Sequence, residues 1–382
     1  MKIVIAPDSF KESMTAMEVC NQIEKGFRKV LPEANYVKIP IADGGEGTVQ
    51  SIIDATDGKL IKKTVTGPLG TLVEGFYAIT GDGKTAVIEM AAASGLHHIP
   101  RKQRNPLLTK TRGTGELILD ALDHGVDRIV LGLGGSATND GGTGMATALG
   151  ITFFDENDVE LVMQGGVLSK IARIDFSGVD QRLKHIVFEA ACDVTNPLVG
   201  PQGASVIFGP QKGATPEMVT ELDQGLNHLG DVVKASLHLD IKDIPGAGAA
   251  GGLGAGVIAF LNGCLKSGIE TILNIVNFND CIEDADLVIT GEGRIDGQTV
   301  HGKAPIGVAK RAKIYGIPVI GLAGGLGEGY QSVYDHGIDA VFSIVNGIST
   351  LDEALLNGKR NVEQTSINIA KTICLNKILQ KV

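Results

Sequence analysis

Short apolar runs alternate with amphipathic stretches at both ends of the chain. An apolar run followed by apolar residues at helical spacing is typical of a βα unit. Near the N-terminus, this pattern predicts a strand, a helix, a strand and a helix over residues 2–6, 15–30, 37–41 and 48–55. In the C-terminal part, it predicts strands over residues 285–290, 318–322 and 340–345 and helices over residues 305–315 and 362–379. Repeated βα units predict a parallel sheet with helices on both faces.

The middle of the chain has a different pattern. Alternating apolar positions and glycine-rich turns predict strands at residues 62–65, 72–79 and 85–90, which favours an antiparallel section. Further strands are predicted at residues 128–133 and 185–191. A second kind of sheet is therefore expected between the two terminal parts.

We predict an α/β protein of two domains. Residues 1–61 and 284–382 are expected to form a discontinuous, Rossmann-like or flavodoxin-like domain with a parallel sheet. Residues 62–283 are expected to form a second α/β domain inserted into the first, with the active site in the cleft between them. The alternative is two consecutive domains that divide near residue 150.

Composition narrows the class of protein. Glycine supplies 52 of 382 residues, about twice the usual ~7%, and its clusters in loops indicate close approach of the backbone to a ligand. A net charge of −10 argues against nucleic-acid and membrane partners, although it is compatible with a small anionic substrate.

The five cysteines include no C-x-x-C pair, which is typical of reduced thiols in a cytoplasmic protein. The chain begins with a predicted strand rather than a signal peptide, and nothing in the sequence indicates the oligomeric state.

Candidate functional residues follow the predicted strands, because ligands of open parallel sheets bind beyond the carboxyl ends of the strands. In the terminal parts these candidates are Asp8, Ser9, Lys11, Asp43, Gly44, Gly45, Glu46, Glu292, Arg294, Asp296 and Lys303. In the middle part they are Ser136, Asn139, Asp140, Asp193 and Asn196, with Lys212 further along the chain. Many carboxylates beside a few cations suit a site for magnesium and phosphate.

Several of these features have other interpretations. Asp8 and Ser9 could cap a helix, and Arg294 could form an ordinary salt bridge. The spacing of glycines in residues 132–137 loosely matches a dinucleotide fingerprint, so an NAD-dependent oxidoreductase acting on a small hydroxy acid is an alternative function. Residues 297–304 nearly match a P-loop, but Ala304 replaces the serine or threonine that would hold Mg²⁺. A binding protein without catalysis is a third class, which the dense carboxylates disfavour.

Five separated motifs, in this order, resemble the bacterial type I glycerate kinases. They are Pro-Asp-Ser-Phe-Lys at 7–11, Ala-Asp-Gly-Gly-Glu-Gly-Thr at 42–48, Gly-Leu-Gly-Gly-Ser-Ala-Thr-Asn-Asp-Gly-Gly at 132–142, Ala-Cys-Asp-Val-Thr-Asn-Pro-Leu at 191–198 and Thr-Gly-Glu-Gly-Arg-Ile-Asp at 290–296. The resemblance extends nearly from end to end. It implies transfer of the γ-phosphoryl group of ATP, with Mg²⁺, to D-glycerate, usually giving 2-phosphoglycerate. It also implies two α/β domains with the active site between them.

Roles within such a site follow from the chemistry of the side chains. Asp193 is our first choice for the base that accepts the hydroxyl proton. Lys11 or Arg294 would bind the carboxylate of glycerate, and lysines would neutralise the transferring phosphoryl group, namely Lys11, Lys212 and Lys303. The expected metal or hydroxyl partners are Asp43, Glu46 and Asp296. The remaining candidates are expected to contact the substrates, namely Asp8, Ser9, Gly44, Gly45, Ser136, Asn139, Asp140, Asn196 and Glu292.

Overall fold

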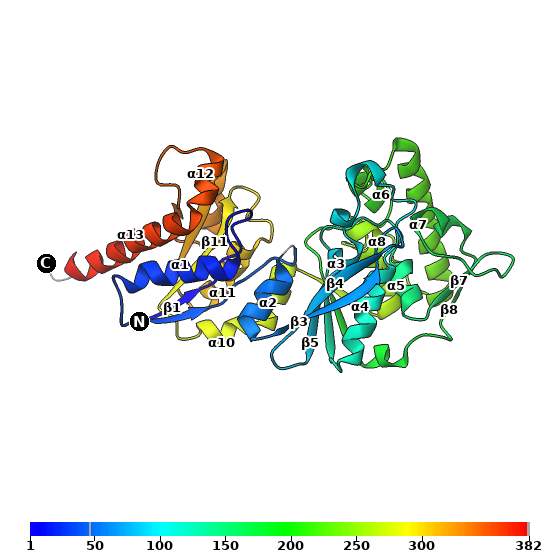
Figure 1. Ribbon diagram of the computed structural model, residues 1–382, viewed down its shortest axis with the longest axis horizontal. Coiled ribbons are helices and arrows are strands. Elements are labelled where there is room, and N and C mark those ends of the chain that lie inside the picture. Colours follow the sequence, from blue (N-terminus) through cyan, green and yellow to red (C-terminus); the bar gives the residue numbers. More distant parts are fainter. Residues whose placement is uncertain (46, 380–382) are drawn as a thin grey trace. The chain divides into compact units, whose positions relative to one another are not determined.

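The computed structural model describes residues 1–45 and 47–379, with side chains through residue 375. The chain divides into two compact units (Figure 1). The first contains residues 1–43, 50–57 and 269 onward, and the second contains residues 44–49 and 58–268. Both units are α/β, as predicted. Among the described residues, none of the helices combines the length and the apolar character that a membrane span requires.

The first unit is built on a five-stranded sheet in the order β13-β12-β11-β1-β2, and every neighbouring pair is parallel. Its strands are β1 (Lys2–Ile5), β2 (Asn35–Lys38), β11 (Leu287–Ile295), β12 (Val319–Leu326) and β13 (Ala340–Ser343). Its helices are α1 (Ala16–Arg28), α10 (Phe278–Ile282), α11 (Ala304–Ile314), α12 (Leu351–Leu356) and α13 (Gly358–Leu379), with a 3₁₀ helix at Tyr330–His336. Two helices begin at the boundary with the second unit, namely α2 (Thr48–Thr56) and α9 (Gly268–Ile275). The predicted parallel sheet is confirmed.

Helices α1 and α13 pack side by side over this sheet (Figure 1). Helix α1 begins at a capping box in which Thr15 and Glu18 satisfy each other's backbone N–H groups. Its inner face buries Ile23 and Phe27 against Ile369 of α13 and against the strands. Gly26 permits the close approach of the two helices, because a Cβ there would lie 2.6 Å from the Glu363 carbonyl oxygen.

One predicted boundary in the first unit was wrong. The pattern ended the strand at residue 290 and assigned residues 291–302 to a loop, but β11 continues through Ile295 and pairs with β12 along that length. The glycines explain the difference. A Cβ on Gly291 would lie 2.2 Å from the Leu322 carbonyl oxygen, and a Cβ on Gly324 would lie 2.4 Å from the Gly293 carbonyl oxygen. The glycines of this motif therefore serve close pairing of strands as well as a turn.

The second unit contains a six-stranded sheet in the order β10-β9-β6-β5-β4-β3 and a separate pair, β7-β8. The strands are β3 (Lys59–Thr66), β4 (Leu72–Ile79), β5 (Thr85–Glu89), β6 (Arg128–Gly132), β7 (Thr152–Phe154), β8 (Arg173–Asp175), β9 (Val187–Ala191) and β10 (Cys264–Lys266). Strands β3, β4 and β5 are antiparallel, as predicted, and β5, β6, β9 and β10 are parallel.

The helices of the second unit surround this sheet. They are α3 (Ala91–Ser94), α4 (Arg112–Asp123), α5 (Thr143–Ala148), α6 (Ala204–Phe208), α7 (Pro216–Leu237) and α8 (Ala249–Leu261). Short 3₁₀ helices lie at Leu96–His98, Arg101–Gln103, Gly165–Lys170, Gln181–His185 and Pro210–Lys212. One core cluster combines side chains of the sheet with α4 and α8, and another lies around α7.

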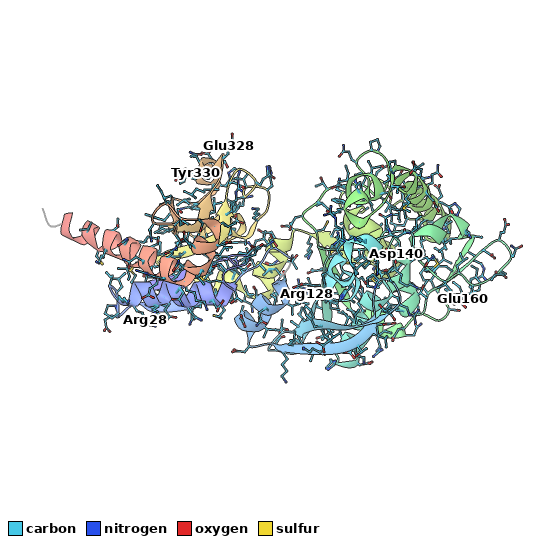
Figure 2. The ribbon with its side chains drawn as sticks, turned by 45° about the horizontal axis from the view of Figure 1, so that its top comes forward. Arg28, Arg128, Asp140, Glu160, Glu328 and Tyr330 are labelled. Atoms are coloured by element: carbon cyan, nitrogen blue, oxygen red, sulfur yellow. The ribbon has the colours of Figure 1, made fainter. Side chains whose placement is uncertain are left out.

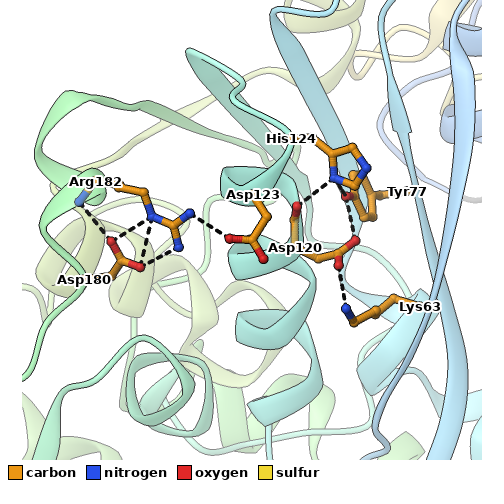
Figure 3. Close-up of polar contacts among 7 residues, drawn as sticks. All are labelled: Lys63, Tyr77, Asp120, Asp123, His124, Asp180 and Arg182. Carbon is orange, nitrogen blue, oxygen red and sulfur yellow. Dashed lines mark hydrogen bonds and ion pairs between the residues drawn. The ribbon is translucent and has the colours of Figure 1, made fainter.

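A buried polar network joins α4 to the antiparallel strands (Figure 3). The hydroxyl of buried Tyr77 donates a hydrogen bond of 2.9 Å to the Asp120 carboxylate and lies 3.1 Å from His124 Nδ1. The same carboxylate forms an ion pair with Lys63, whose Nζ lies 2.7 Å from Asp120 Oδ1. A hydrogen bond to a charged acceptor contributes more than a neutral one.

Tyr77→Phe should therefore lower the free energy of unfolding by about 1–2 kcal/mol, because it removes one bond to a buried carboxylate without changing the shape of the ring. Chemical denaturation would measure the change. Lys63→Met is the control, since the Lys63 side chain is half exposed and its loss should matter less. A smaller effect for Tyr77→Phe than for Lys63→Met would contradict this account of the network.

Candidate functional site

A cavity of about 680 Å³ opens at the carboxyl side of the sheet in the first unit. It is lined by residues from the loop after β1, the ends of β11 and β12, the segment after β13, and α12. Its polar side brings together several residues predicted from the sequence, namely Asp8, Ser9, Lys11, Asp43, Glu292, Arg294 and Lys303. These side chains come from segments nearly 300 residues apart in the chain, and the strand order places their segments together.

The loop after β1 holds Asp8 against β11. The Asp8 N–H donates a hydrogen bond of 2.8 Å to the Gly291 carbonyl oxygen, which continues the pairing of the two strands beyond β1. The Asp8 carboxylate accepts a hydrogen bond of 2.5 Å from the Ser9 N–H. Phe10 and Met14 then close the loop through their backbone groups. Asp8 is thus fixed by the backbone before any ligand binds.

Glu292 extends from β11 and is almost completely buried. Its carboxylate accepts a hydrogen bond of 2.7 Å from the Thr299 hydroxyl and lies 3.2 Å from Lys303 Nζ. Thr299, which the sequence analysis did not single out, is itself completely buried. The only feature of the sequence that could have indicated a functional role for Thr299 was its place within the near P-loop match at residues 297–304.

Asp296 and Arg294 form a pair at the end of β11. Arg294 Nε lies 3.1 Å from Asp296 Oδ2, and the Arg294 side chain is 70% exposed. The other Asp296 oxygen accepts a hydrogen bond from the Gln298 N–H, so this carboxylate shapes the turn after the strand. Arg294 lines the cavity, whereas Asp296 is not among its lining residues.

Two carboxylates of the cavity, Asp8 and Glu292, have raised pKa values. Burial and the negative charges of Asp43 and Glu292 together raise the pKa of Asp8 to about 7, against the opposing hydrogen bond from Ser9. Burial also raises the pKa of Glu292, although Thr299 and Lys303 oppose that rise. A group of acids that repel one another in this way favours the binding of a cation.

No cluster of three or more histidine, cysteine, aspartate or glutamate side chains arranged to hold a metal occurs in residues 1–45 and 47–375. This is compatible with Mg²⁺, which commonly binds one or two carboxylates together with substrate phosphates and water. Glu292 is engaged by Lys303 and Thr299. Asp8, Glu12 and Asp43 are the other carboxylates that line the cavity.

The glycine-rich loop after β6 belongs to the second unit, and its polar residues point inward. Ser136, Asn139 and Asp140 are buried, and Figure 2 labels the position of Asp140. The Asp140 carboxylate accepts hydrogen bonds from the Thr111 N–H and hydroxyl at 2.7 and 2.8 Å, and from the backbone of Gly142 and Gly144. Burial nevertheless raises the pKa of Asp140, and these bonds oppose the rise.

Lys212 is buried beside this loop. Its Nζ donates hydrogen bonds of 2.7 Å to the Ser136 hydroxyl and to the Thr138 carbonyl oxygen. Burial lowers the pKa of Lys212 to about 7, against the attraction of Asp140. The Asn139 side-chain amide donates to Ser205 Oγ at 3.0 Å. In this structure, Lys212, Asn139 and Asp140 hold the loop in shape, and their predicted contacts with substrate remain predictions.

Other predicted residues of the second unit lie after β9 and beside it. Exposed Asp193 accepts hydrogen bonds from the Gly268 N–H at 2.9 Å and from Ser267 Oγ at 3.2 Å. The Asn196 amide donates to the Gln202 carbonyl oxygen at 2.8 Å.

Gly44 and Gly45 approach the ends of β9 and β6 from within the second unit. Gly44 has φ +92°, and a Cβ on it would lie 2.9 Å from the Ala191 side chain. A Cβ on Gly134 would lie 3.6 Å from Gly45 Cα. Only glycine combines this left-handed backbone with so close an approach. Glu46 lies outside the described residues.

Comparison with known proteins assigns this chain to a family. The family model described as the glycerate kinase family matches residues 3–374. The chain belongs to the glycerate kinase family. The glycerate kinase of Halalkalibacterium halodurans is 58% identical over 375 residues, which cover 98% of this chain and 99% of the relative. The glycerate 2-kinase of Escherichia coli is 57% identical over 375 residues, which cover 98% of this chain and 98% of the relative.

A solved structure agrees with the glycerate kinase assignment. The crystal structure of a Salmonella typhimurium LT2 protein assigned as glycerate kinase 2 has a TM-score of 0.92 to this chain, with 52% sequence identity and complete coverage of both chains. The family predicted from the sequence motifs and the predicted fold class are both confirmed. This member of the glycerate kinase family is a kinase.

Proposed function

We propose that this kinase transfers the γ-phosphoryl group of ATP to D-glycerate in the presence of Mg²⁺ and forms 2-phosphoglycerate. The observation that carries the proposal is the cavity in which partly buried Asp8 and Asp43 and buried Glu292 lie among Lys11, Arg294 and Lys303. Phosphoryl transfer requires cations around the moving group and carboxylates that hold the metal ion. The names of the relatives, among them a glycerate 2-kinase, support the substrate and the product.

Each cavity residue has a chemical role in this proposal. Asp8 and Asp43 would hold Mg²⁺, which would neutralise charge on the phosphates when bound. Lys11 and Arg294 would bind anionic oxygens of the phosphates or of the glycerate carboxylate. Lys303 would also contact phosphate, and Glu292 would fix the position of its ammonium group.

The residues outside the cavity keep the roles predicted from their chemistry. Asp193 remains the proposed base, and Asp296 remains a further proposed partner of the metal. We also retain as proposals the contacts of the substrates with Ser9, which lines the cavity, and with a further group outside it, namely Gly44, Gly45, Glu46, Ser136, Asn139, Asp140, Asn196 and Lys212. The division into a discontinuous terminal domain and an inserted domain of residues 62–283 is part of the same proposal.

A turnover assay tests the function directly. The purified protein would be incubated with D-glycerate and either MgATP or NAD, while ADP and reduced NAD are monitored and the product is identified by ³¹P NMR. We expect ADP and 2-phosphoglycerate with MgATP, and no activity in excess chelator. Reduction of NAD without formation of ADP would favour the oxidoreductase alternative, and phosphorylation at the other hydroxyl would correct the product.

Asp193→Asn should reduce kcat by about 10²–10⁴-fold if Asp193 accepts the hydroxyl proton, because positioned bases contribute about that much. The asparagine keeps the side-chain oxygen that accepts from Gly268, so the fold of the loop should survive. Asp223→Asn is a matched control, since Asp223 likewise accepts a backbone N–H, that of Gly200. A loss of less than about tenfold in Asp193→Asn would exclude Asp193 as the base.

A further inference from the structure

The cavity of the first unit has an apolar side that neither glycerate nor a metal ion explains. This apolar wall is formed by Leu326, Val345, Leu351, Ala354 and Leu355. Leu351 is 71% exposed and Leu326 is 37% exposed. Exposed apolar side chains gathered in a cavity commonly mark a ligand-binding surface.

The size of the cavity also exceeds the need of the smaller substrate. About 680 Å³ is within the range of pockets that hold drug-sized ligands. A three-carbon acid is fully polar and would fill only a small part of it. The occupant of the whole cavity must therefore combine an anionic end with a larger apolar end.

The apolar wall is fixed relative to the polar side. Helix α12 begins with a capping box in which Thr350 and Glu353 satisfy each other's backbone N–H groups. The Ser13 hydroxyl, in the loop that also carries Asp8 and Lys11, donates a hydrogen bond of 2.8 Å to the Leu355 carbonyl oxygen. This bond ties the wall to the polar loop, so a ligand that touches both meets a prepared surface.

We propose that the apolar wall binds the purine base of the nucleotide and directs its phosphates toward Lys11, Arg294 and Lys303. The assignment rests on the proposed function, in which the phosphate donor is ATP. A flat purine ring matches aliphatic side chains on one side of a cavity, and the phosphates match the cations on the other. The acids Asp8 and Asp43 then lie at the phosphate end, where Mg²⁺ would accompany the nucleotide.

Calorimetric titration of the full-length protein with MgADP and with magnesium tripolyphosphate tests this assignment. We expect MgADP to bind at least about tenfold more tightly than tripolyphosphate, because each 1.4 kcal/mol of contact with the base corresponds to tenfold in affinity. Leu351→Asn should weaken MgADP binding by about that factor and leave tripolyphosphate binding unchanged. Ala354→Trp, which fills the same space, should have the same effect.

Leu356→Asn provides a matched control. Leu356 is on the same helix and is 85% exposed, but it is not among the residues that line the cavity. Both asparagine substitutions are neutral, so charge cannot explain a difference between them. We expect Leu356→Asn to bind MgADP like the unmodified protein. Equal effects of Leu351→Asn and Leu356→Asn, or equal binding of MgADP and tripolyphosphate to the unmodified protein, would overturn the assignment.

Turnover separates this inference from the proposed function. With Leu351→Asn, the KM for ATP should rise at least about tenfold, while the KM for glycerate stays unchanged. If the unmodified protein phosphorylates glycerate but the KM for ATP is unaffected by Leu351→Asn, the base site is wrong and the function stands. If MgADP binding depends on Leu351 but glycerate is not phosphorylated, the base site stands and the function is wrong.

Discussion

Asp8→Asn should make the protein more stable at pH 8 and at the same time less active by more than about 100-fold. The activity should fall because the asparagine removes a carboxylate that would hold Mg²⁺, and loss of even outer partners of a metal commonly costs about 10–100-fold. The stability should rise because the substitution removes a negative charge from a cavity where burial, Asp43 and Glu292 all disfavour it.

The sign of the pH dependence follows from the pKa of Asp8. The pKa rises from its ordinary value of 3.8 to about 7 in the folded protein. Between these values the folded state binds more protons than the unfolded state, so the free energy of unfolding falls as the pH rises. The difference corresponds to an upper bound of about 4 kcal/mol above pH 7. The stabilisation by Asp8→Asn should therefore be largest above pH 7 and should vanish near pH 4.

Thermal unfolding of both proteins between pH 4 and pH 8, without magnesium or nucleotide, would measure this effect. Asp335→Asn, which changes an exposed carboxylate of the same unit, should show no such pH dependence. MgADP should stabilise the unmodified protein more than the Asp8→Asn variant. A variant that is less stable than the unmodified protein at pH 8 would show that the Asp8 carboxylate is not strained in the folded protein.

Lys212→Met should lower the free energy of unfolding by about 2–4 kcal/mol, which is large for a single substitution. Lys212 is 2% exposed, and its ammonium group binds the Ser136 hydroxyl and the Thr138 carbonyl oxygen. Methionine fills similar space but leaves these buried groups without their donor. Leaving a buried polar group unpaired costs about 1–3 kcal/mol.

Chemical denaturation would measure the loss, and hydrogen exchange should show faster exchange in residues 134–142. Lys234→Met is the control, because Lys234 is largely exposed and pairs with Asp240 at the surface of the same unit. If Lys212 also contacts phosphate, as the sequence predicted, the KM for ATP should rise beyond what the loss of stability explains. Unchanged stability would show that the buried bonds of Lys212 do not hold the loop.

The sequence by itself determined the class of fold and the family. Apolar runs of strand length followed by helical periodicity predicted both the parallel sheet of the first unit and the antiparallel strands of the second. The order of the glycine-acid motifs identified the family. The motifs also named most of the polar residues of the cavity, because in a parallel sheet the residues after the strands meet at one edge.

Only the tertiary structure decided which residues contact one another and which are buried. The glycines of residues 291–293 read as a loop, but their role emerged only from β12, whose backbone approaches too closely for a side chain. The sequence offered Lys212 only as a cation for the phosphoryl group, whereas packing buries it, and burial is a property of the neighbours rather than of the residue. The loop between Asp43 and the second helix likewise combines a feature that the sequence shows with one that only folding decides. Its glycines and acids marked it as functional from the sequence, whereas only folding brings Asp43 to Asp8 and Glu292, where its negative charge helps to raise the pKa of both carboxylates.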